Sequence, residues 1–335
     1  MRTFIALVFV TVASLVATPS VRAQTDIELR DAIRASVSQT FLSKNYALLE
    51  AQATEFRTTR SRTPSGLWKL TLFYAGIDSA ISQATHGQPQ NFKGVDSIVA
   101  DWVAAYPDSP TAHIVQSEVL YYHAMAYRGR RPAISLHLDP WQPFRDLLAT
   151  ARANLEKHKA IASSDPQWYE TMLNIGRLQN WEKQKFMHLL DEALSREPAF
   201  YQTYFAALDY LLPRWSGSIP EIEEFAASAA KRSSATDGSA MYARIYWYAS
   251  QSQFGAGLFS NSMVRWPAMR TAFDDVIAKY PDVWNLNNFA KFACLANDAA
   301  KTKELLSKLG ANNYVAQAWD SKEQFAQCQK RAMRN

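Results

Sequence analysis

Apolar residues recur along most of the chain with the 3.6-residue period of α-helices, and no segment shows the strict alternation of a β-strand. Thr25 and Glu28 have the spacing of a capping box, which predicts that the first helix begins there. Further helices are predicted over residues 46–60, 66–83, 94–105, 110–128, 141–161, 166–179, 182–196, 198–212, 219–232, 239–253, 265–279, 282–296, 299–309 and 321–333. The pattern thus predicts an all-α protein of about fourteen helices.

Prolines lie at or just before several of the predicted helix starts, where the missing backbone N–H removes no helix hydrogen bond. These residues are Pro107, Pro110, Pro166, Pro198 and Pro281. Most connections between helices are short, and the long exceptions are residues 128–140 and the glycine-rich segment 254–262. We therefore predict one helical domain over 24–335, in which 128–140 is a possible soft boundary.

One stretch has the length of a known helical repeat. Pro166 and Pro198 are 32 residues apart, close to the tetratricopeptide period of about 34 residues. Between them, Trp168, Met172 and Gly176 fall where such a repeat places a large, an apolar and a small packing residue. The chain therefore resembles the tetratricopeptide-like superfamily, and this resemblance implies a solenoid of antiparallel helix pairs.

Two segments share the same helix end and the turn after it. Residues 101–108 and 275–282, DWVAAYPD and DVIAKYPD, are identical at five of eight positions.

The C-terminal segment NNFAKFACLAND, with a second cysteine near the chain end, also resembles an uncharacterised family of secreted bacterial helical proteins. That resemblance implies a fold and no activity, so it assigns no catalytic residue.

The first 23 residues have the features of a secretory signal peptide. Arg2 provides a basic start, Phe4 to Ala17 form an apolar run of 14 residues, and Ala23 ends a cleavage site with small residues. The run is shorter than the roughly 20 residues of a membrane span. We predict cleavage after Ala23 and a periplasmic or secreted protein without a membrane span. A retained signal anchor is the alternative.

Composition agrees with a helical fold and argues against a nucleic-acid partner. The chain has 11 glycines in 335 residues, roughly half the usual share of about 7%. Without the two arginines of the predicted signal peptide, the net charge falls from +5 to +3. Nucleic-acid binding requires a concentrated basic surface, which this near balance does not indicate.

The chain has two cysteines, Cys294 and Cys328. In an oxidising compartment such a pair predicts one structural disulfide, here across 34 residues. Two buried free thiols are the alternative. A catalytic cysteine is disfavoured, because it needs a nearby histidine and the last histidine in the sequence is His188.

No other residue pattern indicates an enzyme, a metal site or a cofactor. The six histidines include no pair four residues apart and no His-Glu-X-X-His motif, so zinc is not expected. Ser228 and Lys231 have Ser-X-X-Lys spacing, but the sequence lacks the partner motifs of penicillin-recognising enzymes. It also lacks nucleotide-binding glycine loops and the Gly-X-Ser-X-Gly motif. We therefore predict no cofactor and no catalytic residue.

The aromatic segment 200–218 supplies the candidate binding residues. On a helical wheel, most of its aromatic and leucine side chains fall on one broad arc, which predicts a core-facing helix. Tyr210 lies off that arc next to Asp209, and Trp215 follows in a loop. We therefore predict that Asp209, Tyr210 and Trp215 contact a partner.

The sequence favours a binding function over a catalytic one. We expect an exported helical-repeat protein whose concave face binds a protein or peptide partner. Asn287 and Asn288 are weaker candidates for that face, and for Asn288 a buried structural hydrogen bond is the alternative. The alternative function is a secreted all-α toroid, a glycosidase or polysaccharide lyase, since ten tryptophans and isolated acids could form its site. These acids are Glu118, Asp139, Glu170 and Asp209.

Overall fold

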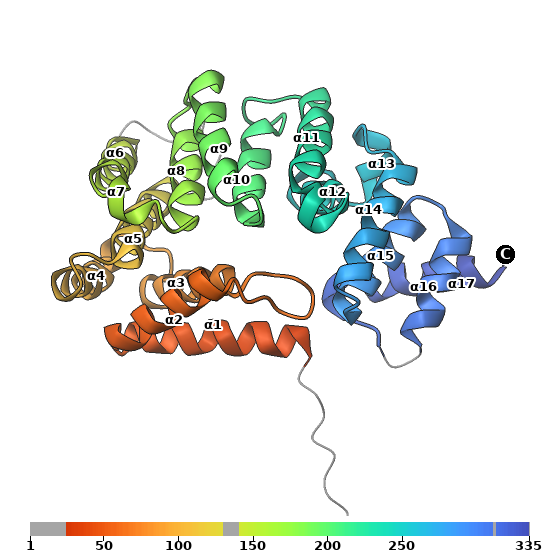
Figure 1. The fold of residues 1–335 in the computed structure, drawn as a ribbon, viewed down its shortest axis with the longest axis horizontal. Coiled ribbons are helices and arrows are strands. Elements are labelled where there is room, and N and C mark those ends of the chain that lie inside the picture. The colour runs from red at the N-terminus through yellow and green to blue at the C-terminus, as the bar shows by residue number, and fades with distance from the viewer. Residues whose placement is uncertain (1–24, 130–140, 311–312, 335) are drawn as a thin grey trace, which may run out of the picture.

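The computed structural model describes residues 25–129, 141–310 and 313–334. The predicted signal peptide, most of the predicted soft boundary at 128–140, and Asp139 lie outside these residues. Regular structure in the described residues is helical, apart from one isolated bridge between Arg62 and Trp68. The prediction of an all-α protein is therefore confirmed (Figure 1).

Fifteen α-helices of the described residues have seven residues or more, close to the predicted number. The α-helices are α1 (Asp26–Leu42), α2 (Tyr46–Thr59), α3 (Lys69–Thr85), α4 (Lys93–Ala105), α5 (Pro110–Arg128), α6 (Trp141–Lys157), α7 (Lys159–Ala162), α8 (Gln167–Leu178), α9 (Lys183–Arg196), α10 (Tyr201–Leu211), α11 (Ile219–Asp237), α12 (Ala240–Ala249), α13 (Leu258–Asn261), α14 (Trp266–Lys279), α15 (Val283–Leu295), α16 (Ala299–Leu309) and α17 (Lys322–Arg334). The short elements are the 3-10 helices η1 (Pro89–Asn91), η4 (Gly255–Gly257) and η5 (Ala316–Ala318) and the π-helix η3 (Ser250–Phe254).

Local sequence signals explain where the helices begin. The predicted capping box is present: Thr25 Oγ1 accepts a hydrogen bond from the Glu28 backbone N–H at 3.3 Å, and Glu28 Oε2 accepts one from the Thr25 N–H at 2.8 Å. Ser109 caps α5 by accepting from the Ala112 N–H at 3.0 Å, and Pro110 occupies the first turn. These bonds satisfy backbone donors that a helix start leaves free.

The helices pack as pairs and follow one another around a broad curve. Helix α1 packs on α3, α5 on α4 and α6, α8 on α9 and α10, α12 on α11 and α14, and α16 on α15 and α17. Figure 1 shows the curve running from α1–α3 through α4–α9 to α10–α12 and then to α14–α17. None of the described helices combines the length and apolar character needed to cross a membrane.

A loop near the N-terminus joins the beginning of the curve to its later helices. This loop, residues 60–68, connects α2 to α3. Its Ser65 carbonyl accepts a hydrogen bond from Asn285 Nδ2 of α15 at 3.0 Å. Its Arg62 donates from Nη2 to the Ala199 carbonyl, before α10, at 2.8 Å. Helices that are distant in sequence are thereby held around a common interior.

The core-facing helix predicted for the aromatic segment is present as α10. Phe200, Tyr204 and Leu208 are fully buried. Burying each such side chain stabilises the fold by roughly 1.5–3 kcal/mol. The high density of rings in this segment is therefore explained by packing between neighbouring helices.

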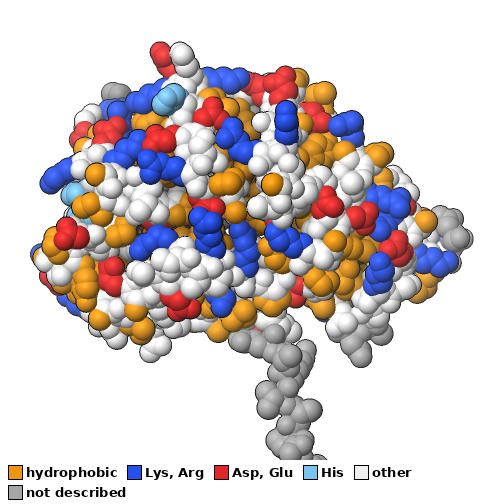
Figure 2. Space-filling model, in the orientation of Figure 1, with side chains coloured by type: hydrophobic (Ala, Val, Ile, Leu, Met, Phe, Trp, Pro, Cys, Tyr) orange, Lys and Arg blue, Asp and Glu red, His pale blue; other side chains and the backbone are white. Residues whose placement is uncertain are grey.

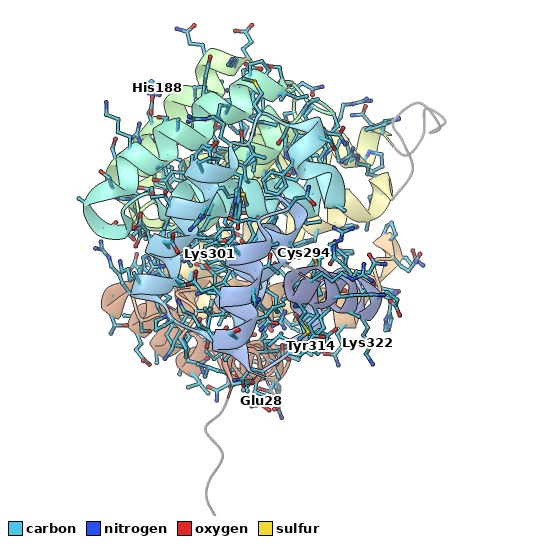
Figure 3. All side chains as sticks on the ribbon, turned by 90° about the vertical axis from the view of Figure 1, so that its right-hand side faces the viewer. Glu28, His188, Cys294, Lys301, Tyr314 and Lys322 are labelled. Atoms are coloured by element: carbon cyan, nitrogen blue, oxygen red, sulfur yellow. A yellow bond between two sulfur atoms is a disulfide. The ribbon has the colours of Figure 1, made fainter. Side chains whose placement is uncertain are left out.

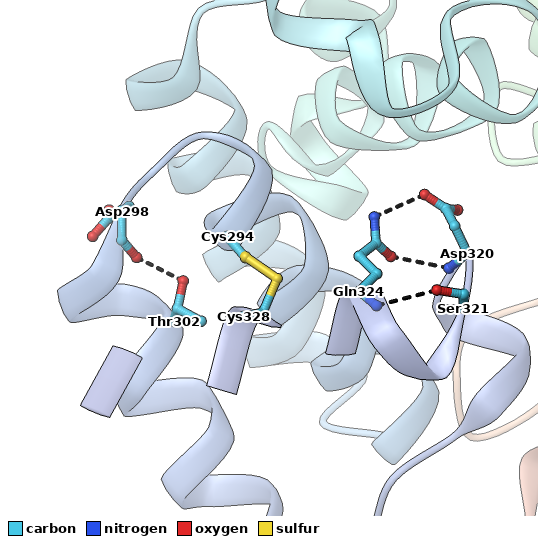
Figure 4. Close-up of a disulfide and its surroundings, with 7 residues drawn as sticks. All are labelled: Cys294, Asp298, Thr302, Asp320, Ser321, Gln324 and Cys328. Carbon is cyan, nitrogen blue, oxygen red and sulfur yellow. Dashed lines mark hydrogen bonds between the residues drawn. A yellow bond between two sulfur atoms is a disulfide. The ribbon is translucent and has the colours of Figure 1, made fainter. Parts of the chain in front are cut away.

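The predicted disulfide joins the C-terminal helices. Cys294 of α15 and Cys328 of α17 are bonded, and their Cα atoms lie 5.7 Å apart (Figure 4). The start of α17 is fixed by Ser321, whose Oγ accepts a hydrogen bond from the Gln324 backbone N–H at 3.1 Å. Figure 3 shows His188 well separated from Cys294. The structural disulfide is confirmed, and it agrees with an oxidising compartment.

Replacing Gly66 should loosen the contact between the 60–68 loop and the later helices. Gly66 has a φ of +91°, and an added Cβ would lie 2.6 Å from Cδ2 of Tyr280. Gly87 has a φ of +65° with open space around it. Both changes to alanine strain the backbone by about 1 kcal/mol, but only Gly66→Ala also displaces a ring. We expect urea unfolding to show a larger decrease in the free energy of unfolding for Gly66→Ala than for Gly87→Ala. Equal decreases in the two variants would contradict the close packing of Gly66 on Tyr280.

Removing the disulfide should lower the free energy of unfolding. The bond closes a loop across 34 residues, for which chain entropy gives about 3–4 kcal/mol. We expect the free energy of unfolding of the Cys294→Ser/Cys328→Ser variant, measured by urea titration, to be lower than that of the wild type by this amount. Thiol counting on the denatured, unreduced wild type should find no free thiol, and two thiols would refute the bond.

Candidate functional site

Two adjoining cavities lie inside the curve of helices. The larger, here called the arginine cavity, has a volume of about 540 Å³. It is lined by Ile27, Arg30, Asp31 and Arg34 of α1, Ser65 and Leu67 of the loop, Thr71, Leu72 and Ala75 of α3, Gln202 and Phe205 of α10, Arg244, Trp247 and Tyr248 of α12, Gln251 of η3, Trp284 and Asn285 of α15, and Gln317 of η5.

The smaller cavity, here called the carboxyl cavity, has a volume of about 190 Å³. It is lined by Thr71, Tyr74, Ala75 and Asp78 of α3, Glu118, Tyr121 and Tyr122 of α5, Gln167, Glu170, Thr171 and Asn174 of α8, and Gln202 of α10. Thr71, Ala75 and Gln202 line both cavities, so the two adjoin.

Arg244 is the most unusual residue of the arginine cavity. Its side chain is 9% exposed, and its Nε and Nη2 atoms are buried without a hydrogen-bond partner in the described residues. The guanidinium instead lies over the rings of Tyr201 and Tyr280, at 4.5 and 5.9 Å from their centres. A buried charge without a hydrogen-bonding partner is costly. These N–H groups are therefore suited to an anionic group that enters the cavity.

Two further arginines of α1 face the same space. Arg30 is paired with Asp26 at 2.5 Å and lies over the Trp284 ring at 5.1 Å, whereas Arg34 pairs with Asp31. Both have a carboxylate within ion-pair distance, whereas no such ion pair is formed by Arg244 in the described residues. Figure 2 shows Lys and Arg side chains in a row across the middle of this face, between α1 and the helices α10 and α12.

Aromatic rings form the apolar wall of the arginine cavity. The Trp247 and Trp284 rings stack at 6.1 Å, and the Phe205 and Tyr248 rings stack at 4.7 Å. All four rings are half-buried, so part of each faces the cavity. Asn285 adds a polar group, because its Oδ1 is buried and lacks a hydrogen-bond donor in the described residues. The cavity thus offers an anion site, an acceptor and an apolar surface.

Three acids from three helices meet in the carboxyl cavity. Gln167 Nε2 donates both to Glu118 Oε1 at 2.8 Å and to Glu170 Oε2 at 2.7 Å, so the two carboxyl groups share one amide. Thr171 also donates to Glu118 Oε1, at 3.0 Å. The third acid, Asp78, is hydrogen-bonded by the Tyr122 hydroxyl. Helix packing thus assembles an acidic cluster from residues far apart in sequence.

Burial shifts the protonation of all three acids in the same direction. Desolvation raises the pKa of Asp78 to about 7 and that of Glu170 to about 8, with repulsion from Asp78 adding to the second shift. The pKa of Glu118 is raised well above its ordinary value, first by desolvation and then by the Asp78 and Glu170 charges. The cluster therefore holds protons near neutral pH when it is empty.

The structure places the three predicted contact residues differently. Asp209 is half-buried and accepts a hydrogen bond from the hydroxyl of Tyr248, a residue of the arginine cavity, at 3.1 Å. Trp215 is half-buried between two cations, with its ring 5.2 Å from the Arg128 guanidinium and 4.6 Å from that of Arg177. Neither residue lines the cavities themselves, and a contact with a partner stays a prediction for both.

The expectation that Tyr210 lies outside the core is wrong. Its side chain is 2% exposed, its ring stacks on Phe186 at 3.9 Å, and its hydroxyl donates to the Trp181 carbonyl at 2.8 Å. Helix α9 covers the face that the wheel of a single helix leaves unoccupied. Tyr210 therefore has almost no surface with which to contact a partner.

The two asparagines are buried in α15. Asn288 is 2% exposed and donates from Nδ2 to the Trp284 carbonyl at 2.9 Å. Asn287 is fully buried, donates to the Asn313 carbonyl at 2.8 Å and accepts from Trp319 Nε1 at 3.0 Å. Structural hydrogen bonds account for both.

Some cavity residues carried a sequence signal and others did not. Glu118 and Glu170 stand out in the sequence as isolated acids in predicted helices, and the structure brings them together. Arg244 could have been found as the one charge in the apolar segment AMYARIYWYA. Asp78 has no such distinguishing context. In the part of the chain that the structure describes, no three His, Cys, Asp or Glu side chains are grouped to hold a metal ion.

Comparison with known proteins does not assign the chain to a class. No protein family, curated protein or solved structure gives a significant match. The site therefore has to be interpreted from its own geometry.

Glu118→Gln should reduce the loss of stability that rising pH causes. The folded-state pKa of Glu118 lies above its ordinary value of 4.5, so its contribution to stability is present at low pH and declines as pH rises toward the folded pKa. Glutamine keeps the oxygen that accepts from Gln167 and Thr171 and cannot ionise. We expect the melting temperature of the variant, relative to wild type, to increase as the pH rises above about 5.

The exposed Glu224 provides the matched control. Glu224→Gln makes the same chemical change outside the cavities, and its melting temperature should follow that of the wild type at each pH. If the melting temperature of Glu118→Gln also changes with pH in parallel with that of the wild type, Glu118 is not a desolvated acid.

Proposed function

We propose that this protein is an exported, tetratricopeptide-like scaffold that binds a peptide in the arginine and carboxyl cavities. The observation that carries the proposal is the buried Arg244 guanidinium, whose Nε and Nη2 lack partners in the described residues. A carboxylate accepts two parallel hydrogen bonds from a guanidinium, which gives both orientation and affinity. The C-terminal carboxylate of a peptide is such a group.

Other features of the arginine cavity support a peptide over a simple anion. Trp247, Trp284 and Phe205 offer apolar surface to side chains. Asn285 presents an unpartnered acceptor, which a peptide N–H can satisfy. A volume of about 540 Å³ lies within the usual range of small-molecule sites and accommodates a peptide of a few residues. Asp209 and Trp215, which lie beside the cavities, are candidates for further contacts with a larger partner.

Glycan cleavage by an all-α toroid is the alternative function. The specific observation in its favour is that Glu118 and Glu170 share the amide of Gln167, because glycosidases use two neighbouring carboxyl groups. Such enzymes need one carboxyl protonated and the other ionised. Here burial raises the pKa of both acids in the same direction, so their surroundings do not separate them into a proton donor and a carboxylate. Binding is therefore the function that the geometry supports better.

The proposal predicts retention of short peptides with a free carboxyl terminus. Purified protein would be mixed with a tripeptide pool, separated by gel filtration and analysed by mass spectrometry. We expect retention to fall at least about tenfold for the C-amidated pool, since a hydrogen bond to a charged group contributes about 1.5–3 kcal/mol. Arg244→Gln should show the same loss.

The control variant is Arg232→Gln, which removes an exposed arginine that pairs with Asp191. It should retain peptides as the wild type does. Because the amidated pool is tested on unaltered protein, the result does not depend on the folding of Arg244→Gln. Equal retention of the free and amidated pools, or no retention of either, would refute the proposal.

A further inference from the structure

The carboxyl cavity contains acceptor atoms that no described group of the protein satisfies. Glu118 is 4% exposed, and its Oε2 atom lacks a hydrogen-bond partner in the described residues. Oδ1 of Asp78 is also buried, and it also lacks a hydrogen-bond partner in the described residues. Both residues line the cavity. Their oxygens are therefore open to a hydrogen-bond donor that enters it.

Tyrosine rings form much of the remaining wall. Tyr74, Tyr121 and Tyr122 line the cavity, and the last two are in T-shaped contact with ring centres 5.3 Å apart. The face of an aromatic ring attracts a cation by about 0.5–2 kcal/mol. Carboxyl oxygens and ring faces together therefore favour a donor that carries positive charge.

We propose that the carboxyl cavity binds an organic primary ammonium group, with Glu118 as its main acceptor. The inference deepens and rests on the proposed peptide binding, because the amino terminus of a peptide is such a group. The arginine and carboxyl cavities adjoin. A short peptide would present its carboxylate to Arg244 and its amino terminus to Glu118, which defines its direction.

A metal ion fits this cavity less well than an ammonium group. Within the described residues, the acids do not form a group of three that could hold a metal, and Ca²⁺ requires about six to eight oxygen ligands. The volume of about 190 Å³ also leaves room for several carbon atoms beside the charged nitrogen. An ammonium group has three donors, which suit separate acceptors in the wall.

The charged groups around Glu118 are mostly acidic. Asp78 comes from α3, Glu170 and Arg177 from α8, and Asp209 from α10. Arg177 is the cation whose field reaches Glu170, and it is held by Asn174. The titratable tyrosines around the group are Tyr74, Tyr121, Tyr122 and Tyr248. Acids outnumber bases here, so a bound cation would offset their repulsion.

Binding of the ammonium group should release a proton. Near neutral pH the empty cluster holds protons, because burial raises the pKa of Glu118 and Glu170. The arriving cation favours the carboxylate, so the O–H bond of one carboxyl group breaks and its proton passes to water, while the ammonium group stays protonated and no other covalent bond changes. The affinity should therefore rise by up to about tenfold per pH unit between roughly pH 6 and pH 8.

Infrared difference spectroscopy with n-butylammonium and 1-butanol tests this site directly. The two probes have the same carbon chain and differ in charge. Adding n-butylammonium near pH 6 should convert absorption of protonated carboxyl groups into carboxylate absorption, and 1-butanol should not. The response should be lost in Glu118→Gln/Glu170→Gln and kept in the exposed control Glu224→Gln.

The wild-type comparison decides the proposal even if the double variant folds poorly. No carboxylate signal with n-butylammonium, or the same signal with 1-butanol, would overturn it. A wild-type signal that persists in a folded double variant would overturn the assignment to Glu118. The peptide test of Arg244 does not enter this measurement. The ammonium site and the proposed peptide binding can therefore fail separately.

Discussion

The contact between the 60–68 loop and helix α15 is the constraint on which the interior of this protein depends. Ser65 and Asn285 are 220 residues apart and share a hydrogen bond of 3.0 Å. Gly66 allows the loop to lie flat against the Tyr280 ring, where a side chain would collide. Arg30 and Arg34 belong to α1, whereas Arg244 belongs to α12. The three arginines line one cavity, and this contact is one of those that hold the two parts of the chain together.

That interior contains charged and polar groups that packing alone does not require. An apolar side chain of similar size in place of Arg244 or Glu118 would avoid the desolvation of a charge. Arg244 is placed between tyrosine rings, and Glu118 is held by Gln167 and Thr171, so both are kept in fixed positions. Groups that are costly to bury and firmly oriented are typical of binding sites. A ligand with complementary charges would recover part of the cost of their burial.

The sequence predicted the helices well and the cavity residues poorly, and the two results have different causes. The bounds of α5 and α16 match the prediction because capping residues and apolar period act within a few turns. The wheel placed Tyr210 off the core because it represents one helix without neighbours, whereas Phe186 of α9 covers that face. The disulfide was predictable because two cysteines allow only one pairing.

What the sequence by itself determined is the all-α class, the helix positions and the Cys294–Cys328 bond. These features depend on local periodicity, on capping chemistry and on a count of cysteines. Only the tertiary structure decided that Asp78, Glu118 and Glu170 share one cavity and that Nε and Nη2 of Arg244 lack a hydrogen-bond partner in the described residues. The reason is that their proximity and burial come from packing between helices distant in the chain, which no local pattern of residues encodes.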